Sequence, residues 1–117
     1  MLNGKNDFAK SQTVIAKGTK IGGKLYFPGS VKIEGEVTGD INTDNILTIG
    51  KNGKVQSTIK TKSAVISGHF KGDMHVTESV EITSTGKFIG NLIQDNAQLS
   101  IEKGGMFKGK STVNGKS

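Results

Sequence analysis

Two histidines and an aspartate are the residues best suited to acid–base or metal chemistry in this chain. His69 and His75 flank Asp73, and an imidazole beside a carboxylate is the usual beginning of a general base or a metal site. Both histidines alternate with apolar residues, so we expect their side chains to point outward. Asp40 and Asp73 hold equivalent places in a repeated unit, and the repetition explains them better than a carboxylate pair does. We therefore predict no catalytic residue and no metal-binding residue.

The composition gives no support to other kinds of catalysis. The chain has no Cys, which excludes a thiol nucleophile and Cys-ligated zinc and fits a reducing compartment. We expect no Gly-rich phosphate-binding loop that ends in Lys-Ser or Lys-Thr, and therefore no nucleotide hydrolysis. The sequence predicts a protein that is not an enzyme and that uses no cofactor.

Lysine dominates the charged residues. The chain has 16 Lys, no Arg and 10 acidic residues, so its formal net charge is +6. One run between Asp44 and Asp73 contains five lysines and no acidic residue: Lys51, Lys54, Lys60, Lys62 and Lys71. The run indicates either a polyanion-binding face or ordinary solvated corners. Because Arg is the residue suited to bidentate recognition of phosphates and bases, we expect no specific nucleic-acid binding, while weak attraction to acidic lipid or polymer stays open.

Six near-copies of one short unit fill most of the chain. Each has an apolar residue, a Gly or other small residue, and a second apolar residue at alternate positions, as in 33–41 and 66–74. The middle apolar residues recur about every 17 residues: Ile21, Val37, Val55, Phe70, Phe88 and Phe107. This period is too short for a helix pair or a propeller blade, which need about 34 and 40–45 residues. It suits one coil of a solenoid with three short strands, whose sides each span under about 20 Å.

Aligning the copies arranges their residues in columns. A first column holds only isoleucine: Ile15, Ile33, Ile49, Ile66, Ile82 and Ile101. A second is the set of middle residues given above, and a third is Leu25, Ile41, Ile59, Met74, Leu92 and Ser111. A column of small residues runs between the second and third: Gly23, Gly39, Ser57, Gly72, Gly90 and Gly109. We expect these small residues to point inward into a narrow lumen.

The predicted fold is all-β, a single-stranded parallel β-helix of about six three-sided coils over residues 13–111. A flexible N-terminal tail is expected over 1–12 and a short C-terminal tail over 112–117, both disordered.

The units 33–41 and 66–74, with the opening 13–23, resemble the bactofilin family of bacterial cytoskeletal proteins. The resemblance extends from about residue 13 to 111, and it implies a right-handed β-helix. It also implies end-to-end filaments that form without nucleotide on the inner face of the cytoplasmic membrane. Members serve as scaffolds in cell shape or protein localisation, so the implied partners are the protein itself, membrane lipid, and cell-wall or morphogenesis proteins.

The two ends of the stack are the predicted polymerisation interface. Terminal coils lack a neighbour on one side, and solenoids normally hide such ends under polar caps because open strand edges invite further pairing. The residues expected at this interface are apolar and lie in the first and last copies: Val14, Ile15, Ile21, Leu25, Leu99, Ile101, Met106 and Phe107. The alternative is that the short tails fold over the ends and cap them.

The N-terminal tail is the predicted membrane-binding segment. Its candidate residues are apolar or basic: Met1, Leu2, Lys5, Phe8 and Lys10. The segment lacks the apolar core of a signal peptide, and no apolar run of membrane-spanning length occurs. We therefore expect a cytoplasmic protein held peripherally on the inner face of the cell membrane.

Two other functions stay open. One is a β-helical module that binds a polyanion or a polysaccharide. The other is a left-handed β-helix acyltransferase, although that fold needs a six-residue repeat and a catalytic His, and the chain does not keep the repeat.

Overall fold

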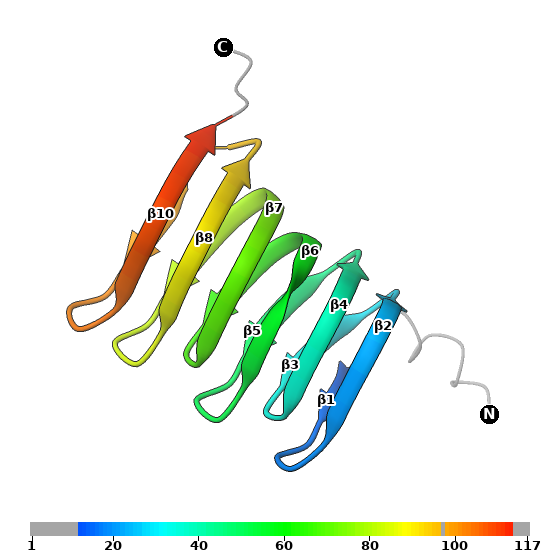
Figure 1. Cartoon of the computed structure of the whole chain (residues 1–117). Coiled ribbons are helices and arrows are strands. Elements are labelled where there is room, and N and C mark those ends of the chain that lie inside the picture. Colours follow the sequence, from blue (N-terminus) through cyan, green and yellow to red (C-terminus); the bar gives the residue numbers. More distant parts are fainter. Residues whose placement is uncertain (1–11, 97, 114–117) are drawn as a thin grey trace.

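The structure, a computed structural model, describes residues 12–96 and 98–113, and these form a parallel β-helix (Figure 1). Its strands are β1 (Gln12–Ile15), β2 (Lys20–Phe27), β3 (Ser30–Ile33), β4 (Glu36–Thr43), β5 (Ile46–Ile49), β6 (Lys54–Ile66), β7 (His69–Ile82), β8 (Lys87–Gln94), β9 (Leu99–Ile101) and β10 (Met106–Val113). The described residues contain no helix, so none of them forms one that could cross a membrane. β1 begins one residue before the predicted domain boundary, and β10 ends two residues beyond it.

Every strand pairing is parallel, and the pairings stack six coils into one sheet that winds on itself. Equivalent residues of successive coils define three sides. Side 1 comprises 12–15, 30–33, 46–49, 63–66, 79–82 and 99–101. Side 2 comprises 20–22, 36–38, 54–56, 69–71, 87–89 and 106–108. Side 3 comprises 24–27, 40–43, 58–61, 73–76, 91–94 and 110–113.

The predicted columns are confirmed by the strand register. Ile15 pairs with Ile33, and the same column continues through Ile49, Ile66 and Ile82 to Ile101. The register also aligns the second and third apolar columns and the column of small residues as predicted. Side 1 has a further inner column that contains Val31, Leu47, Ala64 and Val80. These columns bury the apolar side chains in one continuous core.

The corner between sides 1 and 2 comes in two lengths. Four coils turn through an extra pair of residues, closed by a backbone hydrogen bond such as that from the Gly53 N–H to the Gly50 carbonyl at 2.8 Å. The coils that begin with β3 and with the second half of β6 turn more tightly, at Gly35 and Gly68. A Cβ at Gly68 would overlap the Gly50 carbonyl of the coil before it, so the tight corner requires glycine.

The corner between sides 2 and 3 is the column of small residues. The expectation that these point into the lumen is wrong for the glycines and holds for Ser57, which is buried. Gly39 and Gly90 have φ of 110° and 135°, a region that favours glycine. A Cβ at either position would point along the stack and overlap the carbonyl oxygen of the equivalent residue one coil earlier. Backbone geometry and coil spacing therefore fix the column. Ser57 replaces glycine there without a positive φ, and its buried hydroxyl has no hydrogen-bond partner among the described residues.

Three polar side chains at the end of side 3 are buried, which the sequence pattern did not predict. Thr43 and Thr61 donate to backbone carbonyls of the equivalent corner one coil earlier, with Thr43 Oγ1 2.7 Å from Gly29 O. The Gln94 amide donates to the Gln98 carbonyl at 2.8 Å. Each side chain satisfies a carbonyl at the corner where side 3 turns into side 1.

We predict that Gly90→Ala strongly destabilises the fold and that Gly18→Ala does so only mildly. Both residues have positive φ, which costs a non-glycine residue about 1–3 kcal/mol. Only at Gly90 does the added Cβ also overlap a backbone carbonyl, because Gly18 has open space around it. Thermal unfolding followed by circular dichroism should show a loss of more than about 3 kcal/mol for Gly90→Ala and about 1 kcal/mol for Gly18→Ala. Equal losses in the two variants would contradict this account of the corner.

Candidate functional site

The two ends of the β-helix are the parts of the described fold where the strands lack a neighbouring coil on one side. β1 and β2 lie at one end and β9 and β10 at the other (Figure 1). Each of these strands pairs on one edge only, β1 with β3, β2 with β4, β9 with β7 and β10 with β8. Its second edge has no partner strand among the described residues, so it presents a row of backbone donors and acceptors.

At the N-terminal end, the predicted interface residues belong to the first coil. Ile21 and Leu25 are only partly buried, while the residues in register with them, Val37 and Ile41, are at most 1% exposed. Ile15 is an exception, because its side chain is buried and only 4% exposed. The inner columns of the first coil are thus partly open to solvent where a preceding coil is missing.

At the C-terminal end, the same columns are open on the other side. Ile101 is 44% exposed, whereas Ile82 beneath it is fully buried. Phe107 completes a ladder with Phe70 and Phe88, and successive ring centroids are 4.8 Å apart. Phe107 lies nearly flat on Phe88, with 11° between the ring planes. Leu99 and Phe107 are both partly buried against the core.

Two of the predicted interface residues lie at the rims of the ends. Val14 is in register with Lys32, and Met106 with Lys87. These rows alternate with the inner columns and face outward, so Val14 is 57% exposed and Met106 is 38% exposed. Both side chains therefore project from a side of the β-helix.

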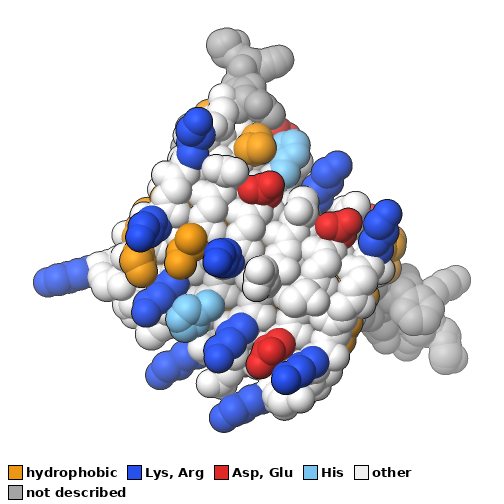
Figure 2. Space-filling view, viewed as in Figure 1, with side chains coloured by type: hydrophobic (Ala, Val, Ile, Leu, Met, Phe, Trp, Pro, Cys, Tyr) orange, Lys and Arg blue, Asp and Glu red, His pale blue; other side chains and the backbone are white. Residues whose placement is uncertain are grey.

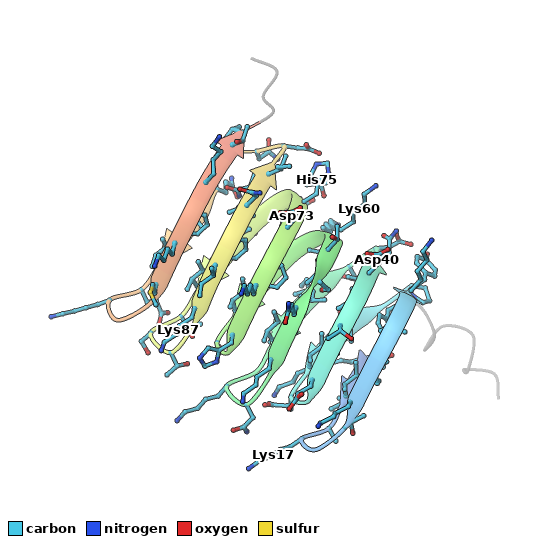
Figure 3. The ribbon with its side chains drawn as sticks, in the orientation of Figure 1. Lys17, Asp40, Lys60, Asp73, His75 and Lys87 are labelled. Carbon is cyan, nitrogen blue, oxygen red and sulfur yellow. The ribbon has the colours of Figure 1, made fainter. Side chains whose placement is uncertain are left out.

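The structure does not join the histidines to Asp73. His75 Nε2 lies 3.0 Å from Asp95 Oδ1, and Asp73 instead accepts a hydrogen bond of 3.0 Å from the Asn91 amide. His69 is exposed on side 2, on the other side of the glycine corner from His75. Figure 3 shows Asp73, His75, Lys60 and Asp40 near the arrowheads, away from Lys87. Within the described residues, no group of three or more His, Asp or Glu could hold a metal ion.

Residues 104–111 match the spacing of a phosphate-binding loop, G-x4-G-K-S, so the expectation that the chain has no such sequence is wrong. Such a loop needs a strand before it and a helix after it, so that backbone N–H groups surround the phosphates. Here residues from Met106 onward form the extended strand β10, paired with β8 along its whole length. The match is therefore a by-product of the repeat, since its second glycine is Gly109 of the corner column.

A hydrogen bond links the first two coils at the outer surface. The Tyr26 hydroxyl donates to Asp44 Oδ2, and Tyr26 is 60% exposed. This hydrogen bond is the main cause that raises the pKa of Tyr26 above its ordinary value of 10.0. The neighbouring negative charge acts in the same direction.

The five predicted membrane-binding residues lie outside the described residues, so their prediction stands without a structural account.

Comparison with known proteins decides the family. The family model described as "Bactofilin: Polymer-forming cytoskeletal" matches residues 13–112. The chain belongs to the bactofilin family. As a bactofilin it is a polymer-forming cytoskeletal protein.

Two curated bactofilins of Myxococcus xanthus (strain DK1622) are similar to this one. Bactofilin BacP is 29% identical over 98 residues, which are 84% of this chain and 40% of BacP. Bactofilin BacO is 26% identical over 99 residues, which are 85% of this chain and 77% of BacO. The chain thus spans less than half the length of BacP and most of the length of BacO.

A solved structure shares the fold of this bactofilin. It is the cryo-EM reconstruction of Thermus thermophilus bactofilin double helical filaments, with a TM-score of 0.74 and 24% sequence identity. The similarity covers 88% of this chain and 99% of the other. The predicted parallel β-helix is therefore confirmed both by the strand pairings and by a related fold.

We predict that Asp44→Asn lowers the pKa of Tyr26 toward its ordinary value. Asn keeps a hydrogen-bond acceptor but removes the carboxylate charge that favours the neutral phenol. The chain has one Tyr and no Trp, so an ultraviolet absorbance titration above pH 9 reports this side chain alone. An Asp40→Asn variant is the control and should titrate like the wild type, because Asp40 is in register with Lys24, two residues before Tyr26, and makes no hydrogen bond to the phenol. An unchanged midpoint in Asp44→Asn would contradict the assignment.

Proposed function

We propose that this bactofilin forms filaments by stacking its terminal coils end to end, without nucleotide, on the inner face of the cytoplasmic membrane. There it acts as a scaffold in cell shape or protein localisation. Its partners are further copies of itself, membrane lipid, and cell-wall or morphogenesis proteins.

The open phenylalanine ladder is the observation that carries the end-to-end part of the proposal. Phe70, Phe88 and Phe107 stack at 4.8 Å, which matches the roughly 4.7–4.9 Å between neighbouring strands. Phe107 has a stacking partner on one ring face only within the described residues. Another subunit that stacks on this end would cover the ring, bury Ile101 and pair the free edges of β9 and β10.

Polymerisation at such an end needs no nucleotide, because the contacts formed there are favourable by themselves. Burial of apolar columns and backbone pairing need no hydrolysis step to become favourable, since burial alone contributes about 25 cal/mol per Å². The segment with phosphate-loop spacing is, from Met106 onward, the extended strand β10, which pairs with β8.

Membrane attachment rests on the apolar and basic residues of the N-terminal segment. A single inserted Leu or Phe stabilises attachment by about 1.5–3 kcal/mol at best, and each Lys near an anionic surface adds about 1 kcal/mol. Ordering the segment offsets part of this, so one subunit binds weakly. A filament carries many such segments and binds tightly through avidity.

Filament formation is tested with Phe107→Arg and a matched control, Ile46→Arg. The first places a charge on the open end of the ladder, and we expect it to abolish filaments in negative-stain micrographs of protein purified without nucleotide. Ile46 is 43% exposed on side 1, in the third coil and away from both ends, so its variant should still form filaments. Discrete particles for the wild type at all salt concentrations and pH values would contradict the proposal.

We predict that vesicle binding depends on assembly. In sedimentation with liposomes, Phe107→Arg should remain largely in the supernatant although its N-terminal segment is intact. Ile46→Arg should pellet as the wild type does. A Phe107→Arg protein that stays monomeric and still pellets like the wild type would refute the avidity argument.

A further inference from the structure

The charges of this protein are distributed unevenly around the β-helix. Side 2 carries five lysines and one acidic residue: Lys20, Lys54, Lys71, Lys87, Lys108 and Glu36. Side 3 carries three lysines and two aspartates, and side 1 carries one lysine and one glutamate. With His neutral, the described residues therefore give side 2 a charge of +4, side 3 a charge of +1 and side 1 a charge of zero.

The corners increase this asymmetry. The corner beside side 2 adds three more lysines, Lys17, Lys51 and Lys103, against Glu34 and Glu102. The corner between sides 3 and 1 is acidic, with Asp44, Glu78 and Asp95 against Lys62. Figure 2 shows lysine side chains gathered along one part of the visible face, with histidine and hydrophobic side chains among them.

The sequence could not show this cluster. The run of lysines between Asp44 and Asp73 is dispersed by the fold, since Lys54 and Lys71 lie on side 2 while Lys60 lies on side 3. The lysines of side 2 instead come from five different coils, and the register between strands places them on the same side.

The side-2 lysines are available to an outside ligand. All five are exposed, and none forms an ion pair with a carboxylate of the described residues. A surface hollow of about 510 Å³ lies among Lys54, Lys71 and Lys87.

Apolar side chains are interspersed with these lysines. Ile89 is 37% exposed, and its register neighbours are Lys71 and Lys108. Met106 is 38% exposed and is in register with Lys87. Exposed apolar residues bordered by lysines are typical of surfaces that bind the headgroup region of a bilayer.

We propose that side 2 is the face with which the filament lies on the membrane, and that its lysines bind the phosphates of anionic lipids. This rests on the peripheral membrane attachment proposed above, and it adds a lipid-binding face within the β-helix itself. A nucleic acid suits side 2 less well, because the chain has no Arg for phosphate forks. Among the described residues, side 2 also has no outward Phe, Tyr or Trp on which bases could stack, and His69 is its one outward aromatic ring. Each subunit of a filament contributes another copy of the face, so the contact grows with filament length.

The test compares two double variants of the full chain that change the net charge equally. Lys71→Gln/Lys87→Gln alters side 2, and Lys24→Gln/Lys60→Gln alters side 3. Both are checked for filaments by electron microscopy and then sedimented with vesicles of phosphatidylglycerol and phosphatidylcholine. We expect the side-2 variant to bind about 30-fold more weakly than the wild type at 0.1 M salt, from the loss of two lysine contacts, and the side-3 variant to lose less than about 3-fold. Vesicles of phosphatidylcholine alone should bind wild type and variants equally poorly.

A third variant, Leu2→Ser/Phe8→Ser, separates this inference from the attachment by the N-terminal segment. If only this variant loses binding and the two lysine variants behave alike, side 2 is not the lipid-binding face, although the proposed function stands. If the wild type forms filaments but does not bind anionic vesicles, both membrane proposals fail and polymerisation remains. If the side-2 variant loses affinity for a short DNA duplex and keeps its affinity for vesicles, the face serves a nucleic acid and the inference is overturned.

Discussion

The register between coils is the constraint on which the rest of this structure depends. Each coil pairs in parallel with the next at the spacing of neighbouring strands, so the strand residues lie directly above their equivalents one coil earlier. The Ile column and the phenylalanine ladder exist because identical side chains pack well at this spacing. The glycines of the corner between sides 2 and 3 follow from it too, since a Cβ there would meet the carbonyl below.

The same constraint explains why the ends differ from the middle. Inside the stack each coil satisfies the backbone groups of two neighbours, whereas the first and last coils satisfy those of one. Columns that are fully buried at Ile82 become half open at Ile101 without any change of residue type. In a structure that repeats one coil-to-coil contact, the terminal coils lack that contact on one side. The family to which the chain belongs is one of polymer-forming proteins.

Periodicity was sufficient to predict the coils and their inner columns, because stacking requires the repeat to be visible in the sequence. It was not sufficient where a residue's partner lies across a corner. The pairing of His75 with Asp95, and the burial of Thr43, Thr61 and Gln94, depend on corner geometry that the repeat does not encode. The glycine column was predicted at the right positions for the wrong reason, since alternation suggests the side of a strand that a residue faces but not a positive φ. For the terminal coils, sequence could indicate the residues, while their degree of exposure needed the three-dimensional stack.

The uneven charge around the β-helix has a mechanical consequence. With side 2 positive and the corner between sides 3 and 1 negative, the subunit is an electric dipole perpendicular to its stacking axis. Near any charged surface such a dipole experiences a torque, which rolls the rod about its long axis until the side of opposite charge faces the surface. The torque acts within about a Debye length, roughly 10 Å at 0.1 M salt, and therefore before contact is made. A rod with this dipole is therefore already rotated about its long axis when it reaches the surface. In a column of aligned subunits the torques add.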